Sequence, residues 1–401
     1  MTQIEHKNAK VLVTGVTGYV GSHVARQLLL HGYKVRGTLR NASDEEKLNK
    51  LRQQITDGLP DNLPEFEFVE ADLLKEDCWP SAVAGCQYVC HVASPFPLQV
   101  PSDPDVIIKP AVEGTLAVLR AAAADGNVKR VVLTSSLAAI HDVKTLDGKQ
   151  DPDKLYNEDD WVDPDKVEAY SQSKILAERA AHKFIEELPQ EEGKKKLELV
   201  VINPSYVLGP ILTDQYSSSV IAIKRLLDRS TPAVPKFSVA ICDVRDVALA
   251  HVKALESPEH VGKRYLIVSD CKWMRDIARI VQKEFKPLGY YVPTMVVPNA
   301  LVWLGSFVDR STVLLVPRLG KEFKLDNKRM VEDLKITPTD VEKTINDTCY
   351  SLIEKGIIRA THKYKKTKQP SGEDVNAENN AQTAGDVPSQ QAQPESAKVE
   401  A

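Results

Sequence analysis

Residues 10–24 read KVLVTGVTGYVGSHV, an apolar run that passes directly into three glycines, Gly15, Gly18 and Gly21. The apolar run predicts a buried strand, and Tyr19–His31 predicts the helix that follows it. In a strand–turn–helix with this GxxGxxG spacing, the first glycine allows a tight turn and the second lets the backbone approach a pyrophosphate. The third lets the helix pack closely on the sheet. Free N–H groups at the start of the helix then face the phosphates. The stretch predicts a dinucleotide-binding turn, with candidate cofactor contacts at Gly15, Thr17, Gly18, Tyr19, Val20 and Gly21.

The alternation of apolar runs and helical patterns continues as far as Pro210. Helices such as Val106–Ala124 and Ala169–Leu188 separate further predicted strands at Lys34–Arg40, Phe66–Glu70, Tyr88–His91, Arg130–Thr134 and Glu198–Asn203. Strands that alternate with helices form right-handed crossovers and a parallel sheet. Continuous apolar runs indicate a sheet covered on both faces. The expected fold class is α/β, a Rossmann-type doubly wound parallel sheet over residues 8–210.

Beyond Pro210 the pattern changes to helices, short strands and proline-rich loops. Residues 211–360 are expected to form a smaller C-terminal substrate-binding lobe at the ends of the sheet, to which this part can also return strands. From about Thr361 the composition shifts to Gln, Asn, Ser, Pro, Ala and acids, with no aromatic residue after Tyr364. Such a segment buries too little surface to offset its ordering entropy, so residues 361–401 are expected to be a disordered tail.

Composition and charge narrow the classes of function. The chain has 401 residues, 42% of them hydrophobic and 27% charged, and its net charge is −4. A general nucleic-acid-binding protein usually carries a basic surplus, so we expect no nucleic-acid partner. The six cysteines include no CxxC pair and have no histidine cluster at ligand spacing near them, which predicts reduced thiols and no metal site. The N-terminal MTQIEHKNAK does not have the pattern of a signal peptide, so a cytoplasmic protein is expected.

The sequence also predicts no membrane span, because no apolar run approaches the roughly 20 residues that a membrane helix needs. The nearest candidate is Met295–Pro317, which is interrupted by proline and by Asp309-Arg310. We interpret it as a substrate lid or a core helix rather than a peripheral membrane contact.

The second predicted strand carries the signal for cofactor choice. It ends at Arg40, where an enzyme that uses NAD usually has an acid for the ribose 2′-hydroxyl, and no acid precedes Asp44. An arginine can clamp a 2′-phosphate, and Lys47 adds charge nearby, so NADP(H) is favoured. After the third strand, Asp72 either bonds the adenine amino group or caps a helix. Leu73 beside it is a further candidate cofactor contact.

Three residues form a candidate reaction centre. Tyr170 and Lys174 are the ends of a YxxxK motif on a predicted helix, and an i, i+4 pair shares one helical face. A lysine ammonium near a tyrosine favours the phenolate and is expected to lower the tyrosine pKa from about 10, which suits general acid–base work near neutral pH. Ser136, at the end of a predicted strand, faces the crevice where this architecture binds ligands, and it either donates to a substrate carbonyl or caps a turn.

Taken in order, the glycine turn, the strand-end serine and YxxxK resemble the extended short-chain dehydrogenase/reductase family, an NAD-dependent epimerase/dehydratase-type domain. Within it, the dihydroflavonol reductase-like and cinnamoyl-CoA reductase-like proteins are most similar. The resemblance covers about Lys10–Arg359, and its matching segments are VTGVTGYVGSHV, VRGTLR, HVASP, LTSS, YSQSK and NPSYVLGP. It implies a NADP-dependent oxidoreductase that reduces a small aldehyde or ketone to an alcohol.

The resemblance also implies roles for single residues. Tyr170 would donate the proton to the carbonyl oxygen, and Lys174 would tune the tyrosine and bind the nicotinamide ribose. Ser136 matches the catalytic serine. The remaining implied cofactor contacts are Ser135 beside it, Arg40 and Lys47 for the 2′-phosphate, Ala93 and Ser94 near the diphosphate and ribose, Pro204, Ser205 and Tyr206 at the carboxamide, and Ser219.

Candidate substrate contacts are Pro95, Phe96, His141 and Tyr216. His141 stands where plant flavonoid reductases carry an asparagine, five residues after the catalytic serine, so the resemblance does not extend to flavonoid specificity.

Alternative functions remain open at this point. The same triad serves a hydroxysteroid dehydrogenase. A sugar-nucleotide epimerase/dehydratase would favour tightly held NAD, against Arg40. A non-catalytic NADP-binding redox sensor commonly loses the tyrosine or lysine, against the intact YxxxK. The expected partner is a small-molecule carbonyl substrate, and the family resemblance implies a monomer or weak homodimer.

Overall fold

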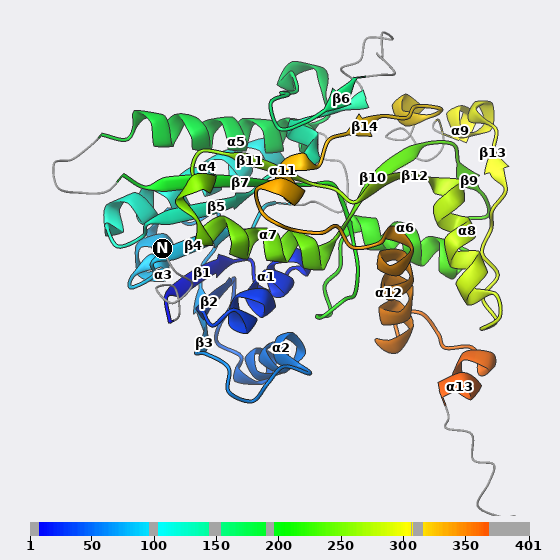
Figure 1. Ribbon diagram of the computed structural model, residues 1–401, viewed down its shortest axis with the longest axis horizontal. Coiled ribbons are helices and arrows are strands. Elements are labelled where there is room, and N and C mark those ends of the chain that lie inside the picture. Colours follow the sequence, from blue (N-terminus) through cyan, green and yellow to red (C-terminus); the bar gives the residue numbers. More distant parts are fainter. Residues whose placement is uncertain are drawn as a thin grey trace, which may run out of the picture.

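The computed structural model of the protein describes residues 8–95, 103–143, 154–189, 196–305, 307 and 316–368. Its centre is a parallel sheet of seven strands (Figure 1). In spatial order they are β3 (Phe66–Glu70), β2 (Lys34–Leu39), β1 (Lys10–Thr14), β4 (Tyr88–His91), β5 (Arg130–Thr134), β7 (Glu198–Pro204) and β11 (Arg264–Ile267). The Rossmann-type sheet is confirmed, and its first six strands lie within one residue of their predicted bounds.

Helices cover both faces of this sheet. On one face pack α3 (Trp79–Val83), α4 (Asp105–Asp125) and α5 (Ala169–Glu187), and on the other pack α1 (Tyr19–Leu30) and α7 (Val244–Glu256). Helix α2 (Glu45–Thr56) lies beside α1. Because side chains alternate along a strand, Leu12 packs into the cluster under α3 and α4, whereas Val11 and Val13 pack into the cluster under α1. Burial on both faces accounts for the continuous apolar runs of the sequence.

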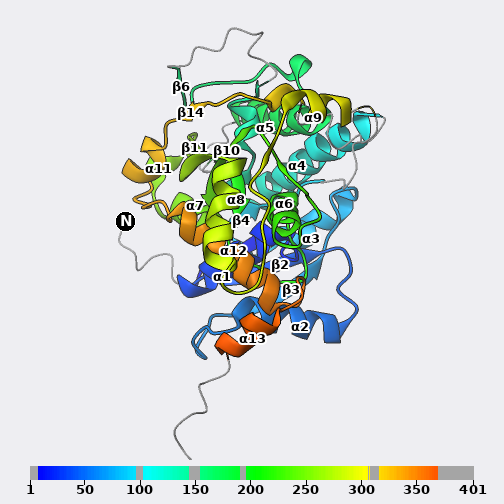
Figure 2. The ribbon, with the colours of Figure 1, turned by 90° about the vertical axis from the view of Figure 1, so that its right-hand side faces the viewer.

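A second group of elements forms the C-terminal lobe. Helices α6 (Ser218–Leu227), α8 (Met274–Phe285) and α12 (Val341–Glu354) lie together in it, as Figure 2 shows from the side. They pack with a small sheet in the order β12 (Asp270–Trp273), β10 (Ser238–Asp243), β8 (Tyr206–Leu208). Two short parallel pairs join β9 (Val234–Pro235) to β13 (Val296–Val297) and β6 (Leu155–Tyr156) to β14 (Lys324–Leu325). The remaining short helix α11 (Lys328–Glu332) packs near β11.

The two parts are interleaved along the chain. Although α7 and β11 belong to residues 211–360, the first covers the large sheet and the second is its edge strand. Residue 210 is therefore not a boundary between two structural units, and the lobe consists of the later segments that stay off the large sheet.

The expected start of the disordered tail is wrong. Helix α13 (His362–Lys368) lies beyond residue 361, and its Tyr364 is only 6% exposed. The Tyr364 ring packs near Tyr350, with 6.3 Å between their centroids, and the Thr361 hydroxyl donates to the Leu288 carbonyl. One aromatic side chain thus holds the segment on the lobe. Residues 369–401 lie outside the described part of the chain.

Only part of Met295–Pro317, the expected lid or core helix, lies among the described residues. Helix α9 (Asn299–Gly305) buries Val302 but leaves Leu301, Trp303 and Leu304 more than half exposed, so α9 is not a core helix. Among the described residues, no helix has the length and apolar character to cross a membrane.

Candidate active site

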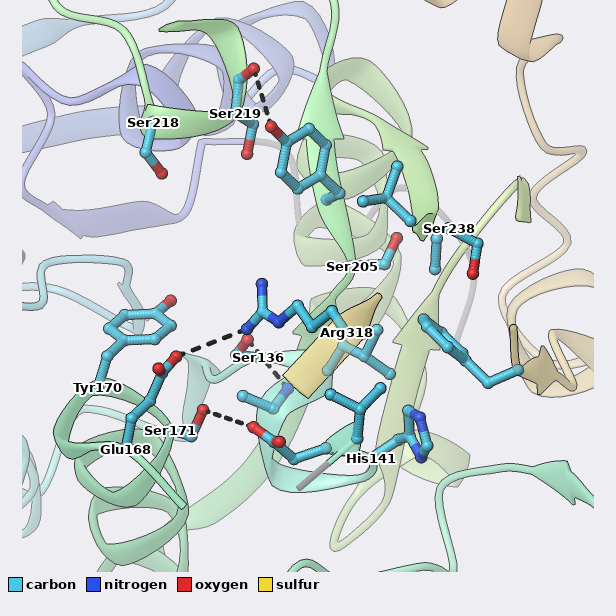
Figure 3. A pocket seen from close by; sticks show the side chains of 18 of the residues that line it. Ser136, His141, Glu168, Tyr170, Ser171, Ser205, Ser218, Ser219, Ser238 and Arg318 are labelled. Atoms are coloured by element: carbon cyan, nitrogen blue, oxygen red, sulfur yellow. Dashed lines mark hydrogen bonds and ion pairs between the residues drawn. The ribbon is translucent and has the colours of Figure 1, made fainter. Parts of the chain in front are cut away.

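The site lies where the C-terminal ends of the large sheet's strands meet the lobe. A pocket of about 470 Å³ opens there, lined by residues after β5, at the start of α5, and from β8, α6 and β10. Ser136, Tyr170, Ser205 and Ser219 line it together, from four separate segments (Figure 3). Ligands of open α/β sheets bind in the crevice at this edge.

The glycine turn fits a dinucleotide. Gly15 has a φ of +66°, and a Cβ placed on Gly21 would lie only 2.3 Å from the Gly15 carbonyl oxygen. Helix α1 therefore starts directly against the turn, with Gly18 at its N-terminal boundary. The Thr14 hydroxyl, at the end of β1, accepts the N–H groups of Val92 and Ala93 at 3.0 and 2.9 Å. These bonds place the segment Val92–Ser94 beside the turn, where the resemblance puts the diphosphate and ribose.

The candidate 2′-phosphate residues sit on the surface beyond β2. Arg40 is exposed. Lys47 on α2 is also exposed, and its Nζ lies 2.7 Å from Asp44, whose carboxylate caps α2 by accepting the Lys47 N–H at 3.1 Å. Asp44 thus competes with a phosphate for Lys47. Asp72 accepts the Leu74 N–H at 3.0 Å within a turn, and the next helix, the 3-10 helix Glu76–Cys78, begins after Lys75, so Asp72 does not cap a helix.

Ser136 and Tyr170 meet at the pocket. The Ser136 hydroxyl accepts the Ala138 N–H at 3.2 Å, which caps a short 3-10 helix, and it also hydrogen-bonds Tyr170. Burial raises the pKa of Tyr170, and the hydrogen bond from Ser136 opposes the rise. The expectation of a lowered tyrosine pKa is wrong for this structure, because burial outweighs every opposing influence. A tyrosine that keeps its proton at neutral pH is suited to donate one.

Lys174 lies one turn further along α5 and is 8% exposed. Its Nζ donates to the Thr134 carbonyl oxygen at the end of β5, at 3.4 Å. Burial lowers the pKa of Lys174 to about 8, and the carboxylate of Glu178 partly opposes that shift. The Thr134 hydroxyl bonds Nε2 of the buried His251 at 2.7 Å, which fixes the strand end that Lys174 contacts.

The segment expected to contact the nicotinamide carboxamide lies at the pocket. Pro204 is the last residue of β7, and Ser205 and Tyr206 follow it into the pocket. The Tyr206 hydroxyl donates to the Ser219 carbonyl oxygen at 3.3 Å, which joins the β7–β8 connection to α6 (Figure 3). The structure thus brings Ser219 next to the Tyr206 side chain, although 12 residues lie between them in the sequence.

The candidate substrate residues do not all meet. His141 lines the pocket but is only 6% exposed, between the rings of Tyr156 and Phe323 at 4.2 and 4.5 Å. Burial lowers the pKa of His141 to about 4, so its ring is neutral at pH 7. Tyr216 packs against the lobe core and is not part of the pocket lining. Pro95 is half-buried outside that lining, and Phe96 lies outside the described residues.

Sequence reasoning missed an ion pair at the pocket. Arg318, which follows the described helix α9, reaches across to Glu168 just before α5, with 3.5 Å between the guanidinium and the carboxylate (Figure 3). Nothing in the local sequence marks Arg318, since its partner lies 150 positions away. Among the described residues, no group of histidine, cysteine and acidic side chains is arranged to hold a metal ion.

Comparison with known proteins agrees with this geometry. The model of the NAD dependent epimerase/dehydratase family matches residues 11–267, so the chain belongs to that family. Cinnamoyl-CoA reductase 1 of Petunia hybrida is 36% identical over 86% of this chain and 92% of its own. Dihydroflavonol 4-reductase of Solanum lycopersicum is 32% identical over 82% and 80%. The fold is similar to the crystal structure of yeast methylglyoxal/isovaleraldehyde reductase Gre2 complexed with NADPH. That likeness has a TM-score of 0.70 and 28% identity, over 87% of this chain and all of that one.

The resemblance to the extended short-chain dehydrogenases/reductases is thereby confirmed. Within that family, the chain is a nicotinamide-dependent oxidoreductase of the reductase type.

Proposed function

We propose that the protein is a NADPH-dependent reductase that converts a small aldehyde or ketone to an alcohol. The observation that carries this proposal is the meeting of Ser136 and Tyr170, hydrogen-bonded to each other, at the wall of a pocket of about 470 Å³. A pocket of that volume suits a small molecule.

In this proposal each of the three residues has a separate role. The hydroxyls of Ser136 and Tyr170 bind the carbonyl oxygen of the substrate, and Tyr170 gives it a proton. Lys174, the next cation along α5, binds the cofactor ribose, and its positive charge stabilises the tyrosinate left after the proton transfer until Tyr170 takes up a proton from solvent. The nicotinamide, when bound, supplies the hydride. Burial raises the pKa of Tyr170, so the group enters the reaction protonated, as the proposed proton donation requires.

NADPH is the proposed cofactor because β2 ends beside an exposed arginine. Arg40 has the position from which a guanidinium can clamp a 2′-phosphate, whereas NAD-specific proteins place an acid there. The similar yeast reductase described above was crystallised with NADPH, which supports the same choice.

The test is NADPH oxidation at 340 nm against a panel of aldehydes and ketones, run beside NADH. We expect turnover that prefers NADPH and is lost in Tyr170→Phe. Tyr290→Phe is the matched control, because the Tyr290 hydroxyl bonds the Arg359 carbonyl in the lobe, at 3.1 Å, outside the pocket lining. Tight NADPH binding without turnover of any carbonyl would favour a redox sensor. Turnover confined to steroids would favour a hydroxysteroid dehydrogenase.

A further inference from the structure

A buried carboxylate lies behind the reaction centre. Glu178 is on α5, one helical turn beyond Lys174, and its side chain has no exposed surface. Its Oε1 accepts a hydrogen bond from Arg264 Nε on β11 at 2.5 Å. Its Oε2 accepts from Asn203 Nδ2 on β7 at 2.9 Å and from the hydroxyl of Ser135, directly after β5. One side chain therefore joins a helix to three neighbouring strands of the sheet.

These bonds continue into the residues assigned to the reaction. Asn203 also donates from Nδ2 to the Ser136 carbonyl oxygen at 3.1 Å, and it directly precedes Pro204. Ser135 precedes Ser136 in the chain. Glu178 thus bonds the side chain of the residue before Ser136 and the Asn203 side chain that in turn bonds the Ser136 carbonyl. Arg264 extends the network outward, where its Nη1 donates to the carbonyl oxygens of Glu158 and Asp160 at 2.7 and 2.8 Å.

Of the titratable groups around Lys174, the Glu178 carboxylate is the one whose charge acts on it. From β4, His91 faces Lys174, but burial lowers the pKa of His91 to about 3 and keeps it neutral. On α5, Tyr170 has a raised pKa, and His182, whose Nε2 lies 3.9 Å from Glu178, has a lowered pKa. Among the described residues, two further charged groups face this set: Arg264, whose guanidinium lies against Glu178 on the side of β11, and Glu168, whose carboxylate helps to raise the pKa of Tyr170. Glu178 is the negative charge that acts on Lys174.

We propose that Glu178 is a positioning residue for the reaction: it fixes the Ser135–Ser136 and Asn203–Pro204 segments against α5, and it places a buried carboxylate one helical turn from Lys174 on α5. The inference rests on the proposed function only in its choice of reaction. A buried ion pair is weak support for stability, because its desolvation offsets its attraction. The position of Glu178, among catalytic segments, is what assigns it a role in chemistry.

The experiment separates charge from shape with two variants. Glu178→Gln keeps the shape and removes the charge, whereas Glu178→Asp keeps the charge and shortens the side chain. The readout is the pH profile of kcat/KM for carbonyl reduction. Loss of a nearby negative charge favours deprotonation of Lys174 and of Tyr170 alike, so both move the alkaline limb in the same direction. We expect Glu178→Gln to shift that limb to lower pH by about one unit. Glu178→Asp should lower kcat and leave the limb in place.

Glu158→Gln is the matched control. Glu158 is 3% exposed and accepts the Leu266 N–H at 2.9 Å, yet its carboxylate does not touch the catalytic segments. The alkaline limb of the kcat/KM profile of Glu158→Gln should coincide with that of the wild type. If Glu178→Gln keeps the wild-type limb, or if Glu158→Gln shifts it equally, the proposal is overturned.

Two further measurements apply if Glu178→Gln does not fold or if the wild-type protein shows no carbonyl reduction. If Glu178→Gln does not fold, because Arg264 is left unpaired, the variant Glu178→Gln/Arg264→Gln removes both charges. It should show a smaller shift in the same direction, because Arg264 is farther from Lys174 along the network and its lost positive charge acts the opposite way. If the wild type reduces no carbonyl, the proposed function fails, but the proton on Lys174 can still be followed. NMR of ε-¹³C-lysine, assigned with Lys174→Arg, should then show Lys174 titrating at lower pH in Glu178→Gln. An unchanged titration overturns the role of Glu178 by itself.

Discussion

The close contact between α1 and the glycine turn can be tested by the substitution Gly21→Ala, which adds one methyl group at the contact. A Cβ on Gly21 would lie 2.3 Å from the Gly15 carbonyl oxygen and 3.0 Å from its carbon. Since carbon–oxygen contacts are ordinarily no closer than about 3.3 Å, Gly21→Ala must move α1 and the turn apart by about 1 Å. Both partners are backbone, so no side-chain rotation relieves the overlap.

The cost follows from two opposing effects. Overpacking costs about 1–3 kcal/mol, and the upper end applies because backbone must move. Replacing a glycine by alanine inside a helix stabilises the helix by about 1 kcal/mol, which partly offsets the overpacking cost. The expected loss is about 2 kcal/mol of unfolding free energy, which corresponds to a fall of about 2–4 °C in the melting temperature of a chain of this size. NADPH affinity should fall about tenfold or more, because the displaced turn no longer meets the pyrophosphate.

Differential scanning fluorimetry with and without NADPH, together with a fluorescence titration of NADPH, measures both effects. Gly305→Ala at the end of α9 is the control, because a Cβ at that position would meet no atom within 4 Å. We expect Gly305→Ala to melt no lower than the wild type and to keep its NADPH affinity. A Gly21→Ala protein that melts and binds NADPH like the wild type would refute the close approach of α1 to the turn.

Three further predictions concern single groups. Tyr170→Phe should lower kcat by about 10²–10⁴ with little change in the NADPH dissociation constant, which stopped-flow turnover and titration distinguish. Arg40→Ser should weaken NADPH binding by about tenfold or more and leave NADH binding unchanged; equal losses for both cofactors would contradict the 2′-phosphate role. Burial lowers the pKa of His23 and His251 to about 4 and that of His91 to about 3. The unfolded chain binds these protons below about pH 6.5 and the folded chain does not, so stability is full above pH 6.5 and falls as the pH drops toward 4. A melting temperature that stays constant from pH 7 to pH 4.5 would contradict this.

The sheet could be predicted because its signals are local. The five consecutive residues Lys10–Thr14 predict a buried strand, and the glycines that follow them predict the turn. The edge strand β11 gave no comparable signal, since Arg264–Ile267 is short and begins with a charged residue. Its place in the sheet depends on pairing with β7, which is more than 60 positions earlier. Helix α13 was missed for a similar reason, because one tyrosine among lysines carries its packing.

The reaction centre shows the same division between local and distant signals. YxxxK fixed the spacing of Tyr170 and Lys174, but it did not indicate which influence on the tyrosine would be larger. That depends on how much water the surrounding elements exclude, and here burial raises the pKa despite the nearby serine. The sequence also gave no indication that Arg264 and Asn203 bond Glu178, because a single arginine or asparagine inside a strand belongs to no recognisable motif. Their role follows from the common carboxylate of Glu178, to which β7 and β11 bring them from two separate segments of the chain. A buried charge is costly unless it is paired, so a sequence that keeps Glu178 and Arg264 inside the sheet layers must hold both at fixed positions. The Glu178–Arg264 pair requires fixed positions for both side chains, and the neighbouring Ser135–Ser136 segment also has to be held in place for the proposed reaction. We therefore propose that the buried pair positions that segment.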